Sequence, residues 1–154
     1  MTRVINTAGP GKRRNQLRRT IAEVLRHLMF KRELDRESKD MAALLAFSLQ
    51  GIAETVEVTA SAWEKRNYYL KADRFRLEWE WVTLAAQRLQ EAIINDRWEN
   101  LPQELASLAP HFADIRIARM TRPSSAWDSS YDLLMVRARE TEMTPGHLDE
   151  QGSP

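Results

Sequence analysis

The sequence predicts an all-α protein: a helical bundle of four to five helices built on a long antiparallel hairpin of the second and third helices. Two observations predict this class. Between Gly11 and Leu101 there is no proline and Gly51 is the only glycine, so the residues that mark strands and tight turns are almost absent. Helix-forming Ala, Leu, Glu, Arg and Gln dominate the same stretch. The hairpin is expected to span roughly Asp35 to Arg97.

Residues 1–13 are predicted to form a flexible basic arm, because Gly9-Pro10-Gly11 is expected to interrupt a helix and no apolar periodicity is present. A first helix is expected from about Asn15, as its N-cap, to Lys31 or Arg32. Its apolar face repeats at steps of four, three and four residues, as expected for one side of a helix. The residues of this face are Leu17, Ile21, Val24 and Leu28.

The second helix is predicted to begin after Asp35, a favourable N-cap, with Glu37 in its first turn. Its apolar stripe consists of Leu45, Leu49, Ile52, Val56, Thr59 and Trp63. The uncharged run over residues 41–53 is 13 residues long. A membrane span needs about 20 apolar residues, so this run predicts a buried core helix and no membrane partner.

The third helix has the most regular pattern in the chain. Eight apolar positions follow steps of four and three without a polar exception: Tyr68, Ala72, Phe75, Trp79, Val82, Ala86, Leu89 and Ile93. A second row lies alongside: Leu70, Leu77, Trp81, Leu84 and Ala85. The register of the second helix breaks near Lys65–Asn67, which predicts a turn there. The alternative is one continuous helix of about 60 residues, about 90 Å long, which would need a partner chain.

Residues 14–122 are expected to form the bundle domain. A short fourth helix is predicted from Pro102 to Ala109, ended by Pro110. Residues 111–122 fit either a short helix or an irregular docked segment. Residues 123–139 are interpreted as a linker and a short segment, helical over Asp132–Arg139, that packs back on the bundle or binds a partner, and residues 140–154 as a disordered tail.

The residue inventory disfavours catalysis. The chain has no cysteine, so it has no disulfide and no thiolate nucleophile or ligand. Helical metal sites use Glu-x-x-His pairs, whereas Glu23 and His27 are four residues apart; an exposed contact on the polar side of the first helix is expected instead. Gly9-Pro10-Gly11-Lys12 lacks the spacing of a phosphate loop. We therefore expect a non-enzymatic protein with no cofactor and no metal.

Paired charges fit surface positions. Arg74–Glu78 and Arg76–Glu80 have the spacing of salt bridges within one helix. The absence of an apolar stretch after the N-terminal basic residues disfavours a signal peptide. We expect a cytoplasmic protein.

The first functional hypothesis is a subunit of a nucleoprotein assembly. Residues 1–22 carry six basic groups and no acid, although the net charge of the whole chain is only +1. A basic arm that leads into a basic helix can bind RNA or DNA through phosphate contacts. The candidate residues are Lys12, Arg13, Arg14, Arg18 and Arg19. An ordinary solvated terminus explains the same residues.

The second hypothesis is a protein–protein scaffold or adaptor that oligomerises, or binds a partner, through the surface of the second and third helices. Aromatic residues there alternate with basic ones, a pattern also found where bases stack. The heptad spacing favours core or interface positions instead. The candidate interface residues are Tyr69, Leu77, Trp81, Trp127 and Tyr131.

Overall fold

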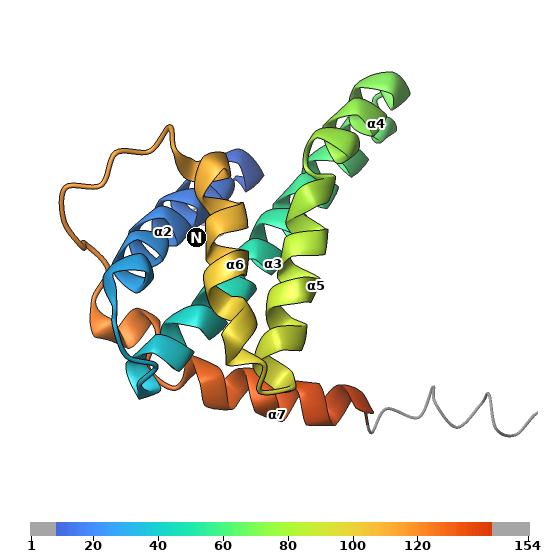
Figure 1. Ribbon diagram of the computed structural model, residues 1–154. Helices are drawn as coiled ribbons and strands as arrows, with labels where there is room; N and C mark the ends of the chain where they lie inside the picture. Colours follow the sequence, from blue (N-terminus) through green and yellow to red (C-terminus); the bar gives the residue numbers. More distant parts are fainter. Residues whose placement is uncertain (1–8, 143–154) are drawn as a thin grey trace, which may run out of the picture.

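The computed structural model describes residues 9–142, and within that range the chain is helical, with no strand. The predicted all-α class is confirmed. Figure 1 shows the helices grouped around α3, with α7 lying across one end of the molecule. Residues 1–8 and 143–154 lie outside the described residues, and with them most of the predicted arm and tail.

Helix α2 (Pro10–Phe30) begins five residues earlier than the predicted Asn15. The prediction that the arm extends to residue 13 is therefore wrong for residues 10–13. Pro10 does not interrupt this helix but starts it, because the first helical position needs no N–H donor and suits the fixed φ of proline. The end at Phe30 lies close to the predicted one.

Helix α3 (Arg36–Lys65) begins where its N-cap predicts. The Asp35 carboxylate accepts a hydrogen bond from the backbone N–H of Ser38 at 2.8 Å. By length and composition α3 is the one described helix apolar enough to cross a membrane, but 61% of its apolar window is buried inside the bundle. Such burial is typical of the core helix of a soluble protein.

The chain turns between α3 and α4, and Asn67 there has a φ of 67°. This left-handed conformation ends helices, as the register break predicts. The alternative of one continuous helix of about 60 residues is wrong. The expected third helix is itself divided into α4 (Tyr69–Glu78) and α5 (Glu80–Ile94). The break is at Trp79, whose backbone (φ −106°, ψ 8°) leaves helical geometry where the indole packs against Phe75.

A short 3₁₀ turn, η1 (Trp98–Asn100), leads into α6 (Leu101–Leu108), and Pro102 lies in the first turn of α6 as predicted. α6 ends at Leu108, and the chain continues as a second 3₁₀ turn, η2 (Ala109–Phe112), which contains Pro110. The residues after η2 have no regular structure as far as η3 (Ser124–Ala126), so residues 113–122 adopt the irregular alternative.

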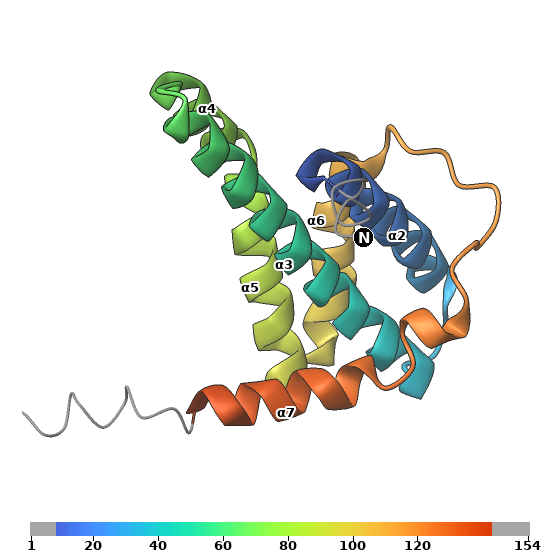
Figure 2. The same cartoon turned by 180° about the vertical axis from the view of Figure 1, so that it is seen from behind.

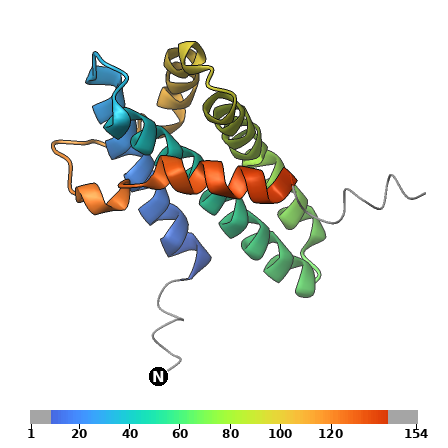
Figure 3. The same ribbon diagram turned by 90° about the horizontal axis from the view of Figure 1, so that it is seen from below.

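Helix α7 (Ser130–Glu142) follows, and it is longer than the short helix predicted over Asp132–Arg139. Residues 140–142, assigned to the tail by the sequence, belong to it. α7 packs against α3, and Figure 3 shows it running across the ends of the other helices. The segment 123–139 therefore contributes to the bundle, and the predicted domain boundary at residue 122 is not a boundary in the structure.

The core surrounds α3, which packs against α2, α4, α5 and α7. Figure 2 shows α3 passing diagonally across the molecule, in front of α5. Fully buried apolar side chains from three helices fill this core: Ile21, Val24, Met41, Leu45, Leu49, Ile52, Val82, Leu89 and Ile93. Gly51 allows a close approach of α2, since a Cβ there would lie 2.8 Å from the Leu17 Cδ1 atom.

Candidate functional site

Arg14, predicted to contact phosphates, is instead a core residue with 9% of its surface exposed. Its guanidinium donates hydrogen bonds to the hydroxyls of Thr55 (3.3 Å) and Thr59 (2.9 Å) on α3. It also lies 4.9 Å from the ring centre of Phe75, within the range of a cation–π contact. Burial lowers its pKa, and the charge of Glu78 opposes that shift. Arg14 is therefore not available to a polyanion.

Arg18 and Arg19 are also engaged within the protein. Arg18 donates to the Asp114 carboxylate at 2.7 Å and to the backbone carbonyl of His111. Arg19 donates to Glu23 at 3.0 Å and to the carbonyl of Arg116. Both side chains thus hold η2 and the irregular segment 113–122 against α2. The prediction that they contact phosphates is not supported by these positions.

Lys12 and Arg13 are the two predicted phosphate contacts that remain exposed, and neither forms an ion pair within residues 9–142. Only these two of the five predicted residues face solvent without a charged partner. Each of the other three has at least one partner on a distant segment, so the sequence alone did not reveal this difference.

Glu23 is a buried anchor that the sequence analysis missed. Its side chain is 0% exposed, and its carboxylate accepts hydrogen bonds from the backbone N–H and the hydroxyl of Thr121. The Arg122 guanidinium donates to the same carboxylate at 3.1 Å, so Glu23 binds two successive residues, Thr121 and Arg122. The predicted exposed contact of Glu23 with His27 is wrong: His27 lies 3.9 Å from Glu37 instead.

The electrostatics of Glu23 follow from these contacts. Burial on its own would raise the pKa of this carboxyl, but the hydrogen bonds from Thr121, Arg19 and Arg122 outweigh burial and lower the pKa to about 2. Glu23 is therefore a carboxylate wherever the protein is folded near neutral pH. It ties segment 111–122 to α2, and its fixed charge and saturated hydrogen bonds leave it no acid–base role.

Two of the predicted interface residues pack inside the protein. Trp127 is 6% exposed and belongs to the core. The backbone N–H of Tyr131 donates to the Asp40 carboxylate at 2.9 Å, and its ring lies 6.0 Å from that of Trp98. Of the two alternatives for this segment, packing back on the bundle is the one observed.

Trp81 also has its partners within the chain. Its ring stacks on His111 with 3.6 Å between the ring centres and 10° between the planes. Phe112 meets the same indole edge-on at 5.9 Å. Trp81 therefore joins α5 to the 3₁₀ turn η2, and is not a free interface residue.

Tyr69 and Leu77, the other two predicted interface residues, do face solvent: they are 58% and 70% exposed. The structure adds two leucines to them. Leu70 is 63% exposed and Leu84 48% exposed. Leu70, Leu77 and Leu84 are spaced seven residues apart and lie opposite the buried side of their helices. We refer to these three residues as the leucine row.

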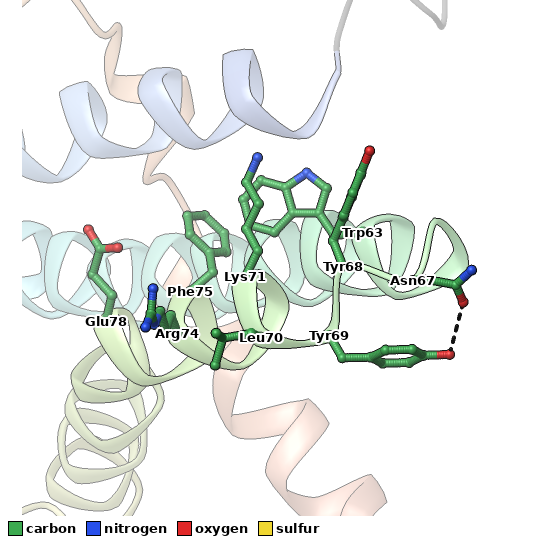
Figure 4. Close-up of a pocket in the computed structure, with 9 residues that line it drawn as sticks. All are labelled: Trp63, Asn67, Tyr68, Tyr69, Leu70, Lys71, Arg74, Phe75 and Glu78. Atoms are coloured by element: carbon green, nitrogen blue, oxygen red, sulfur yellow. Dashed lines mark hydrogen bonds between the residues drawn. The ribbon is translucent and has the colours of Figure 1, made fainter.

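A groove lies beside the leucine row, between α4 and the end of α3, and has a volume of about 590 Å³. Figure 4 shows Trp63, Lys71 and Phe75 on one side of α4 and Tyr69 and Leu70 on the other. Lys71 covers the face of Trp63, with its ammonium 4.3 Å from the ring centre. Phe75 meets the same indole edge-on at 5.0 Å. These rings are therefore already in contact with the protein and are not free for base stacking.

Arg76 fixes α4 to α3. Its guanidinium bonds to Glu57 and to Glu64, at 2.8 Å in each case. These bonds raise the pKa of Arg76 and lower the pKa of both carboxyls. The predicted pairs Arg74–Glu78 and Arg76–Glu80 do not form within the described residues, and Arg76 pairs with acceptors on α3 instead. Glu57 could have been predicted as a partner of Arg76 only from the packing of α4 against α3.

The helix face around Leu77 consequently carries charges of both signs. Arg74, Asp73, Glu78 and Glu80 are all exposed, and Arg74 forms no ion pair within the described residues. Among residues 9–142 no group of three His, Asp or Glu is placed to hold a metal ion. The most exposed feature of the site is therefore an apolar row bordered by charges of both signs.

The comparisons with known proteins give no relative. No protein-family model, no curated protein and no solved structure is significantly similar to this chain.

Proposed function

We propose that this chain is a non-enzymatic cytoplasmic scaffold protein that associates with a second copy of itself through the leucine row of α4 and α5. The observation that carries the proposal is the exposure of Leu70, Leu77 and Leu84 at a spacing of seven residues. A lone exposed leucine is ordinary on a protein surface. Three at a spacing of seven residues, the repeat of a coiled coil, are typical of helix–helix association.

The framework that we infer for this row is an antiparallel helical hairpin. α3 leads to the turn at Asn67, and α4 and α5 return along α3 and pack against it. The Arg76 bonds to Glu57 and Glu64 hold α4 in that place. The row therefore lies on a supported surface, which keeps the entropy lost on association small.

The charges beside the row favour a second copy as the occupant. Two basic residues, Lys71 and Arg74, and three acidic ones, Asp73, Glu78 and Glu80, are exposed here. A face with both signs is not repelled by its own image, whereas a face with one sign would be. A two-fold pair uses the same patch on both chains, as in most soluble homo-oligomers.

The expected association is weak to moderate. Stable interfaces bury about 800 Å² on each partner, and three leucines with their neighbours cover less than that. We therefore expect a dissociation constant in the range of about 1–100 µM.

Sedimentation equilibrium from roughly 10 to 500 µM tests the proposal. The wild-type chain should pass from monomer to dimer, and Leu77→Glu should remain monomeric because a charge would enter the centre of the apolar row. Val58→Glu is the matched control, since Val58 is 57% exposed on α3, outside the row. A wild-type chain that stays monomeric over the whole range would overturn the proposal.

Nucleic-acid binding is the second candidate, kept because Lys12 and Arg13 face solvent. If Lys12 and Arg13 make two phosphate contacts, a plot of the logarithm of the binding constant against the logarithm of the salt concentration should have a slope of about −2. Lys12→Ala with Arg13→Ala should remove that slope. A slope near −5 would mean that Arg14, Arg18 and Arg19 leave their partners to bind, and no retention at low salt would end this candidate.

A further inference from the structure

A second apolar surface lies at the end of α2, separate from the leucine row. Phe30, the last residue of α2, is 76% exposed, and Met29 and Leu34 beside it are 53% and 46% exposed. We refer to Met29, Phe30 and Leu34 as the Phe30 surface. In Figure 1 the end of α2 and the helix α4 lie at opposite ends of the molecule. A large, exposed aromatic residue at a helix end is costly in water and is typical of a docking position.

Phe30 stands between two hollows. One has a volume of about 420 Å³, and its floor is apolar: Ala22, Leu25, Ala109, Phe112, Ile115 and Ile117. The other has a volume of about 230 Å³ and is bounded by Ile117, Met120 and Arg119. Arg26 and Phe30 border both hollows. An inserted side chain on either side of Phe30 would therefore meet apolar groups.

The wall of both hollows is held in place before any partner arrives. Ile115 and Ile117 belong to the irregular segment that Glu23 binds through Thr121 and Arg122. The same segment is fixed at its start by the Arg18–Asp114 ion pair. A preformed apolar wall reduces the ordering that binding requires.

The rim of the Phe30 surface is basic. Arg26 and Arg119 border the hollows beside Phe30, and Arg32 borders a neighbouring groove lined by Met29 and Leu34. All three arginines are exposed, and none forms an ion pair within residues 9–142. The carboxylates on the same rim do not balance them. Glu23 is buried and saturated by its own partners, which leaves Glu33 as the exposed acid. The unpaired charge beside the apolar hollows is therefore positive.

We propose that the Phe30 surface is a docking site for an acidic segment of another protein that carries an apolar anchor. The anchor would enter a hollow beside Phe30, and its carboxylates would meet Arg26 and Arg119. A second copy of this chain offers no matching negative charge, because its exposed apolar face around Leu70 and Leu77 carries charges of both signs. A nucleic acid would leave Met29, Phe30 and Leu34 in water.

Selection from a random peptide display library on the full wild-type chain tests this site without a known partner. We expect the enriched peptides to have net negative charge and an aliphatic or aromatic residue. Each synthesised peptide should bind Phe30→Ser at least about tenfold more weakly than the wild type. Arg26→Glu with Arg119→Glu should weaken binding similarly, because the rim then repels the carboxylates.

The controls separate this site from the leucine row and from unfolding. Arg139→Glu, a charge reversal on the exposed side of α7, should leave the affinity unchanged. Leu77→Glu, which should remain monomeric, should also bind the peptides as the wild type does. Failure of the proposed self-association would therefore leave this test unaffected. Because Phe30 is exposed, its serine variant should keep the wild-type melting temperature. The proposal would be overturned if the enriched peptides were neutral or basic, or if no peptide were enriched. It would also be overturned if Phe30→Ser bound the peptides as tightly as the wild type.

Discussion

The carboxylate of Glu23 accepts hydrogen bonds from both the backbone N–H and the hydroxyl of Thr121, which lies 98 residues further along the chain. This pair joins α2 to the irregular segment that leads to η3 and α7. It therefore links the first described helix to the last part of the bundle, and it supports the wall of the Phe30 surface.

Glu23→Ala should lower the free energy of unfolding by about 3–5 kcal/mol at neutral pH. The reason is that Thr121 and Arg122 lose the buried charge that pairs with them, which is the costly way to break such a network. Urea denaturation measures this change. Glu54→Ala, an exposed carboxylate on α3, is the control and should stay within about 0.5 kcal/mol of the wild type. Equal losses for both variants would contradict the buried network.

The stability of the protein should fall in acid because of the same residue. Its folded-state pKa of about 2 lies below its ordinary value of 4.5, so the unfolded state binds the proton more tightly. The contribution of Glu23 is therefore present above pH 4.5 and is lost as the pH falls towards 2. Urea denaturation at pH 6, 4, 3 and 2 should show a steeper decline for wild type than for Glu23→Gln. Parallel curves would exclude Glu23 as the cause.

Arg14→Met should destabilise the protein by about 2 kcal/mol, because Thr55, Thr59 and the ring of Phe75 lose their buried partner. Lys12→Met on the exposed first turn should change stability by less than about 0.5 kcal/mol. Thermal denaturation of the two variants compares them directly. If the effects are reversed, Arg14 is a surface residue in solution.

Local signals in the sequence predicted the helix boundaries well. Asp35 caps α3 through Ser38, Asn67 adopts the left-handed conformation at the turn, and Pro102 starts α6. Each of these depends on residues within four positions in the sequence. The early start of α2 was not predicted, because a proline such as Pro10 can either interrupt a helix or occupy its first position. Which of the two occurs depends on the residues that follow the proline.

The candidate sites were less predictable because their contacts are distant in sequence. Arg14 looks like Arg13 in a basic run, but Thr55 and Thr59 are more than 40 positions away and draw it into the core. Trp127 looked like part of a docking peptide and is buried by the bundle. Leu70 and Leu84, by contrast, carry a readable signal, since they share a heptad row with Leu77.

The close packing of α2 on α3 at Gly51 gives a further prediction. Gly51→Ala gains about 1 kcal/mol of helix propensity, and the flexible end of Leu17 can move from the new Cβ, so the net change should be small. Gly51→Leu should cost about 1–3 kcal/mol because backbone must then shift. Gly51→Leu combined with Leu17→Ala should recover part of that loss in denaturant melts. Additive losses would show that Leu17 and residue 51 do not share this space.

The most direct test of the proposed self-association uses the absence of cysteine from the chain. A single Leu77→Cys substitution places the only thiol in the middle of the leucine row, and a disulfide needs the two Cα atoms within about 7 Å. Mild oxidation at about 100 µM protein should then give a covalent dimer, while Val58→Cys under the same conditions stays monomeric. Equal or absent cross-linking of the two variants would contradict association through the leucine row.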